Sequence, residues 1–193
     1  NADFYFDSAA DAELTGAPSL RVALLDVAGN LRTREASALL AATFQSTADP
    51  TELASLAKLL DRAEPGKGHA GFLAAARETL AVAASGRWDG RDVAPLFEML
   101  DRFGGAAALP GLERVANHWP DYTAITLLEL PEGAGLPLLI NLAQTAEGRP
   151  KSGRDGFQRA LAEAALAHPS AWQSLLDQVR AGKITVTAWP DVA

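Results

Sequence analysis

A helix-like pattern of apolar and polar positions recurs along the chain. The segment 49–62 returns at 89–102, and two shorter copies follow farther along the sequence. The anchor residues of the copies are 40, 43 and 36 residues apart and are Leu53, Val93, Leu136 and Trp172. A repeat of this length, with helical segments on both sides of each anchor, is typical of stacked helix pairs.

Start and stop signals divide the pattern into helices. Ser19 and Thr33 can each cap a helix, and Asp49, Pro50 and Glu52 form a capping box with proline at the first helical position. A second box is expected at the last helix. The predicted helices span residues 19–28, 33–45, 49–63, 71–84, 89–103, 110–118, 121–130, 136–146, 155–167 and 170–181.

Several helix ends are predicted from residues that break or terminate helices. Gly29 with Asn30 should end the first helix, and Pro120 should end the helix that begins at Pro110. The segment 148–153 reads as an exposed loop. The second capping box consists of Ser170 and Gln173.

The core should be built from apolar positions that share one register. The first helix carries four apolar residues too densely spaced for an exposed position, namely Val22, Leu24, Leu25 and Val27. One face of the second helix is apolar at Ala36, Leu39, Leu40 and Phe44. The equivalent buried leucines of the four copies should be Leu56, Leu96, Leu139 and Leu175. Because Trp172 replaces Leu53 in the repeat, we expect it to be buried as well.

The chain divides into three predicted parts. Residues 1–18 form an N-terminal arm, and residues 19–183 form the helical repeat domain. Residues 184–193 are rich in β-branched residues and extended in character, which predicts a strap along the last helices with Trp189 buried. Such a strap would cover the open end of a helical array.

Two segments resemble the HEAT repeat. That family's unit has a Leu-Pro-x-Leu-x-x-Leu first helix and an Arg- and Ala-rich second helix, which the segments 136–142 and 159–166 resemble. The resemblance covers roughly residues 31–182. It implies an all-α fold, a right-handed α-α superhelix of the HEAT or armadillo type with about four to five helix pairs. Asp61 and Asp101 resemble the family's acidic turn residue, but no arginine recurs at a fixed distance after them.

The resemblance implies a non-enzymatic scaffold or interaction domain that binds a protein or peptide within a larger bacterial protein. Two alternatives remain open. HEAT-like enzymes include DNA-repair glycosylases and tetrapyrrole lyases, and some helical arrays are purely structural spacers. The sequence therefore predicts a fold more sharply than a function.

Composition narrows the classes of partner. The chain has 193 residues, 17 basic and 24 acidic side chains and no cysteine, for a formal net charge of −7. Without a run of basic residues a nucleic-acid partner is disfavoured, because nucleic acid requires a basic surface. Cysteine-based metal sites and disulfides are excluded, and no apolar stretch is long enough to span a membrane.

Candidate catalytic and metal-binding residues do not form a known constellation. His69, His118 and His168 lack the spacing that places two imidazoles on one metal ion. The glycine-rich segment 64–71 lacks the strand and the Gly-Lys-Ser/Thr ending of a phosphate-binding loop. We therefore expect no catalytic residue, no metal and no cofactor.

Binding residues are predicted from charges on successive second helices. These helices carry paired charges at Arg34 and Glu35, Arg77 and Glu78, Glu113 and Arg114, and Arg159 and Glu163. If the arginines project along one side, they suit a polar protein or peptide partner. Trp88 lies between Arg87 and Asp89 and is a candidate interface residue. The alternatives are ordinary surface charges, and a Trp88 that covers the groove between neighbouring helix pairs.

Overall fold

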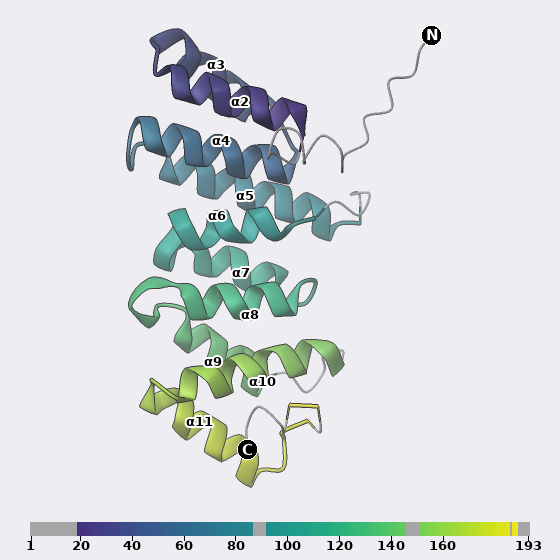
Figure 1. Ribbon diagram of the computed structural model, residues 1–193. Coiled ribbons are helices and arrows are strands. Elements are labelled where there is room, and N and C mark those ends of the chain that lie inside the picture. Colours follow the sequence, from purple (N-terminus) through teal and green to yellow (C-terminus); the bar gives the residue numbers. More distant parts are fainter. Residues whose placement is uncertain (1–18, 87–91, 146–150, 186, 189–193) are drawn as a thin grey trace. The chain divides into compact units, whose positions relative to one another are not determined.

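The computed structural model describes residues 19–86, 92–145, 151–185 and 187–188. These residues form an all-α fold without a strand, which confirms the all-α part of the predicted fold class (Figure 1). None of the helices in this part of the chain is long and apolar enough to cross a membrane. The helices are α2 Leu20–Leu31, α3 Arg34–Ser46, α4 Pro50–Ala63, α5 His69–Ala84, α6 Ala94–Gly104, α7 Leu109–Val115, α8 Pro120–Glu129, α9 Leu136–Gln144, α10 Lys151–Ala165 and α11 Pro169–Arg180.

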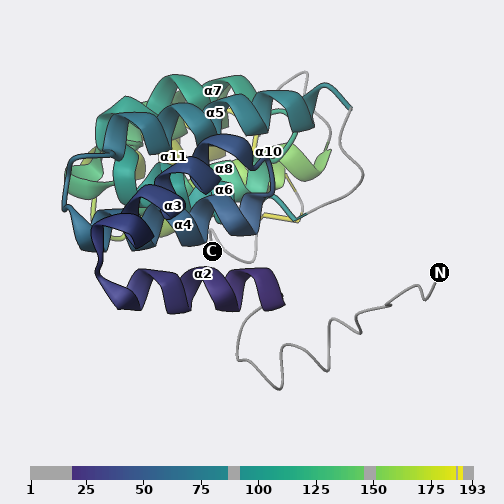
Figure 2. The ribbon, with the colours of Figure 1, turned by 90° about the horizontal axis from the view of Figure 1, so that it is seen from above.

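The chain separates into two compact units. Unit 1 comprises Asn1–Thr79 and Gly90–Met99, and unit 2 comprises Leu80–Asp89 and Leu100–Ala193. In unit 1, α2, α3 and α4 pack against one another (Figure 1, Figure 2). Their shared core is apolar and consists of Leu25, Leu40, Leu56 and Leu59.

The predicted helix caps of unit 1 are confirmed, and the capping box at Asp49 also involves Thr47. The side chains of Ser19, Thr33 and Asp49 accept hydrogen bonds from the first-turn amides of α2, α3 and α4. In the capping box at Asp49, the Thr47 side chain links the Glu52 side chain to the Asp49 amide. The Asp49 amide donates to Thr47 Oγ1, and the Thr47 hydroxyl donates to the Glu52 carboxylate at 2.7 Å. Glu52 Oε1 also pairs with Arg21 at 2.7 Å, so this carboxylate ties α2 to α4.

Two predictions for α2 are wrong. The helix continues through Gly29 and ends at Leu31, with Arg32 in the left-handed region at φ 53°. A Cβ at Gly29 would be 2.7 Å from the side chain of Leu59, so the missing side chain allows α2 to approach α4. Of the four apolar residues expected to be buried in α2, two are exposed. Leu24 and Val27 are 60% and 58% exposed, because the face of α2 that packs toward α3 and α4 contains Val22, Leu25 and Ala28 instead.

In α3 the predicted apolar face is partly correct. Ala36 and Leu40 are buried and Phe44 is half-buried, but Leu39 is exposed. The face that packs on α4 is therefore narrower than the sequence suggested.

Unit 2 is organised around α10, which packs against α8, α9 and α11. Its core includes a buried amide, Gln158. The Gln158 side chain donates to the carbonyl of Lys183 at 2.9 Å and to Gln178, and it accepts from the Thr185 amide at 3.0 Å. These bonds attach residues 183–185 to α10. Trp189 lies outside the described residues, so the strap as a whole stays a prediction.

Several helix boundaries of unit 2 differ from the predictions. Pro120 begins α8 instead of only ending the preceding helix, because proline fits the first turn, where no amide donor is needed. Helix α10 begins at Lys151, and Gly153 is buried, so the predicted exposed loop is wrong for residues 151–153, whereas 148–150 lie outside the described residues. The described residues show no side-chain cap at α11. Pro169 is its first residue, which places Ser170 inside the helix.

All four leucines predicted from the repeat are buried, which confirms this part of the pattern. They are Leu56, Leu96, Leu139 and Leu175. Trp172 is 51% exposed, so its predicted burial is wrong. The buried face of α11 contains Ala171 and Leu175, and Trp172 falls beside this face.

Candidate functional site

A cavity of about 480 Å³ lies in unit 1, where α3 faces the end of α4 and the start of α5. We call it the aromatic pocket. Its lining is mostly apolar or small and consists of Arg34, Ser37, Ala38, Ala41, Phe44, Gln45, Leu60, Ala63, Glu64, Lys67, Gly68, Gly71 and Phe72. Concave, largely apolar cavities with a few polar groups are the usual form of binding sites.

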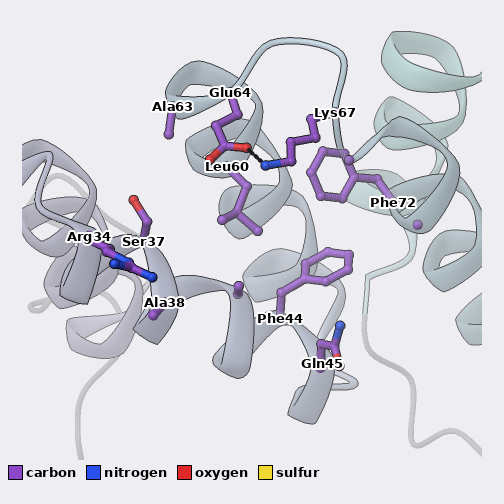
Figure 3. A pocket seen from close by; sticks show the side chains of 13 residues that line it. Arg34, Ser37, Ala38, Phe44, Gln45, Leu60, Ala63, Glu64, Lys67 and Phe72 are labelled. Carbon is purple, nitrogen blue, oxygen red and sulfur yellow. Dashed lines mark ion pairs between the residues drawn. The ribbon is translucent and has the colours of Figure 1, made fainter.

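The aromatic wall of the pocket is formed by Phe44 and Phe72. Their rings meet edge to face, with centroids 5.2 Å apart and an interplanar angle of 71° (Figure 3). Gly68 is required next to this wall, because a Cβ at that position would overlap the ring of Phe72. A Cβ at Gly71, by contrast, would meet no atom within 4 Å. Small residues thus keep the cavity open.

The rim of the pocket carries charge. Arg34 comes from the first turn of α3, opposite the aromatic wall in Figure 3. Lys67 forms an ion pair with Glu64. In the part of the chain that the structure describes, no carboxylate pairs with Arg34. The pocket therefore joins an apolar interior to an exposed guanidinium.

A second cavity of about 340 Å³ adjoins the first. We call it the arginine pocket, because Arg32 and Arg62 line it. It shares Ser37, Ala63 and Glu64 with the aromatic pocket. Like Arg34, neither arginine has an ion-pair partner among the described residues.

The connection between α4 and α5 is held by Asp61. Its Oδ1 accepts from the Gly66 amide at 3.1 Å and lies 2.7 Å from Nε2 of His69. The glycine-rich segment is thus a helix–helix connection, as predicted, and its fixed shape positions Lys67 and Gly68 at the pocket. His69 and Asp61 do not line either cavity.

The predicted binding arginines lie in both units. Arg77 is in unit 1, is half-buried on α5, and its Nε has no hydrogen-bond partner within the described residues. Arg114 and Arg159 are exposed in unit 2, on α7 and α10. Trp88 lies outside the described residues. The common groove predicted for these residues stays a prediction, whereas Arg34, from the same predicted series, lines the aromatic pocket.

Other titratable groups add little to the site. Burial raises the pKa of the Asp101 carboxyl above its ordinary value. Among the described residues, no three His, Cys, Asp or Glu side chains lie together as metal ligands would. His118 contacts the ring of Trp119 at a centroid distance of 5.7 Å.

Comparisons of this chain with protein-family models, with curated proteins and with solved structures find no match.

Proposed function

We propose that the chain is a non-enzymatic interaction domain that binds a protein or peptide in the aromatic pocket. The observation that carries this proposal is the open cavity itself. Burying apolar side chains normally closes such a space, yet here Ala38, Ala41 and Gly71 leave it free. A bulky side chain of a partner can fill it and thereby remove apolar surface from water.

The proposed architecture is a HEAT- or armadillo-like array in which the helix pairs stack into an α-α superhelix. Two features support this proposal. Helices adjacent in sequence pack in pairs, such as α3 with α4 and α10 with α11. The leucines of the four sequence copies are all buried. Arrays of this kind present extended binding surfaces.

Peptide selection tests the binding function. A random peptide library displayed on phage is selected against the wild-type chain, and enriched peptides are tested on Gly71→Leu and Ala74→Leu. Gly71→Leu places a bulky side chain on the lining of the aromatic pocket and replaces a helical glycine with a better helix former. Ala74 is an exposed residue on the same helix that does not line the pocket, so Ala74→Leu is the matched control.

We expect the enriched peptides to bind the wild type and Ala74→Leu but not Gly71→Leu. Peptides that bind all three proteins equally, or a selection without enrichment, would contradict binding in this pocket. Such a result would favour the spacer function instead.

A further inference from the structure

We infer that the partner segment combines a bulky apolar side chain with acidic neighbours, the apolar group entering the aromatic pocket and the carboxylates contacting Arg34, Arg32 and Arg62. This inference rests on the proposed binding function and adds the chemistry of the partner. It concerns unit 1 alone, because every residue of both cavities belongs to that unit.

The first argument is charge. The chain has a formal net charge of −7, yet three arginines gather around two adjoining cavities. Within the described ranges none of the three is in an ion pair. Guanidinium groups bind carboxylates through paired hydrogen bonds, which are stronger and more directional than neutral ones. An acidic segment would supply the missing partners.

The carboxylates near the cavities do not cancel this charge. Glu64 lines both pockets, but Lys67 pairs with it. Glu35 is exposed on α3 and lines neither cavity. The shared rim is therefore basic on balance.

The second argument is that two of the arginines occupy positions that cost stability. Arg34 is the first residue of α3, where the helix dipole disfavours a positive charge. Arg32 has φ 53°, a conformation that costs a non-glycine residue energy. The fold alone explains neither residue. Arg62 differs, because the last turn of α4 favours a cation.

The third argument separates an acidic peptide from a nucleic acid, which would also attract arginines. Binding to a polyanion depends on many basic contacts along its backbone, whereas the basic side chains of the two cavities gather at one shared rim. The aromatic wall and Leu60 instead provide an apolar site beside the arginines. Anchoring by one buried side chain with charges at its edge is the usual arrangement of a peptide interface.

Calorimetric titration of the full chain with three synthetic peptides tests the inference. The first has a phenylalanine flanked by two glutamates on each side. The second replaces the glutamates with glutamines, and the third replaces the phenylalanine with alanine. We expect the first peptide to bind and each of the others to bind at least about tenfold more weakly, as loss of a charge-assisted contact or of a buried ring predicts.

Two charge-reversal variants locate the contact. Arg34→Glu should weaken the acidic peptide at least about tenfold. Arg180→Glu makes the same charge change at an exposed residue of unit 2 that lines neither cavity, and it should leave the affinity unchanged. Circular dichroism of both variants verifies that they are folded. Equal loss in both would show a nonspecific effect of net charge and would overturn the inference.

The remaining outcomes distinguish this inference from the proposed function. If the glutamine peptide binds as tightly as the glutamate peptide, the acidic preference is wrong, while binding in the pocket stands. If the glutamate peptide does not bind, the inference is wrong, and the phage selection decides the function independently. Tighter binding of a short oligothymidylate than of the acidic peptide would identify a nucleic-acid partner and also overturn it.

Discussion

Helix α10 buries polar side chains, whereas helix α2 exposes large apolar ones. In α10, Gln158 and Asp155 are buried, with 1% and 7% exposed. The exposed side chains of α2 include four large apolar residues on one face, Leu20, Leu24, Val27 and Leu31. The difference follows from their surroundings. Helix α10 packs against three helices of unit 2, whereas in the described part of unit 1 the contacts of α2 are with α3 and α4. Residue type alone therefore does not determine which face becomes core.

The largest expected loss of stability follows from a substitution in the leucine core of unit 1. Leu56→Ala removes a side chain with 0% exposure and should lower the free energy of unfolding by about 2–5 kcal/mol, because it leaves a cavity. Leu24→Ala in the same unit removes an exposed side chain and should change it by less than about 0.5 kcal/mol. Urea unfolding of both variants measures the difference. A similar loss in both would mean that the α2 face is covered in solution.

Two glycines give a second contrast between the units. A Cβ at Gly135 would overlap the backbone carbonyl of Leu127, whereas one at Gly71 meets open space. Gly135→Ala should destabilise the chain by about 1–3 kcal/mol. Gly71→Ala should stabilise it by about 0.4–1 kcal/mol through restriction of the unfolded chain. We expect the melting temperature to fall below that of the wild type in Gly135→Ala and to rise above it in Gly71→Ala. Shifts in the same direction for both variants would contradict this contrast.

The buried amide of α10 can be removed with little change in shape. Gln158→Met loses the bonds to Lys183 and Thr185 and should cost about 1–3 kcal/mol. Amide hydrogen exchange offers the specific readout, since the Thr185 amide should exchange faster than in the wild type. Unchanged exchange at Thr185 would show that the tail is held by other contacts.

The smallest effect is expected at the cap of α4. Asp49→Ala removes the acceptor for the amides of Thr51 and Glu52 and should cost about 1 kcal/mol. Asp49→Ser keeps a capping oxygen and should cost less. If both variants melt at the wild-type temperature, the cap does not contribute measurably.

Helix starts could be predicted because their signals are local. Ser19, Thr33 and Asp49 cap amides two or three residues away, so their role is visible in a short stretch of sequence. The shared register predicted burial correctly for the four leucines but not for Trp172. Leu24 belongs to a dense apolar run and Trp172 takes the place of Leu53 in the repeat, but both lie on faces that their neighbouring helices leave exposed.

The aromatic pocket could not be predicted as a site, because its walls come from residues far apart in sequence. Arg34 and Phe44 are on α3, whereas Phe72 is on α5. One local signal was present. Gly68 and Gly71 both shortly precede Phe72, and a Cβ at Gly68 would overlap its ring, whereas one at Gly71 would meet no atom within 4 Å. Without α3 in place, these glycines could only be assigned to a connection.

The free space at Gly71 also makes the protein suited to covalent ligand discovery. The chain contains no cysteine, so Gly71→Cys would introduce a single thiol at the aromatic pocket without meeting neighbouring atoms. Disulfide-bearing fragments that dwell in the cavity would be captured there and identified by mass, whereas the same thiol at Ala74 would report background reactivity. Position 71 is thus a defined attachment site for chemical probes at the pocket proposed to bind a partner.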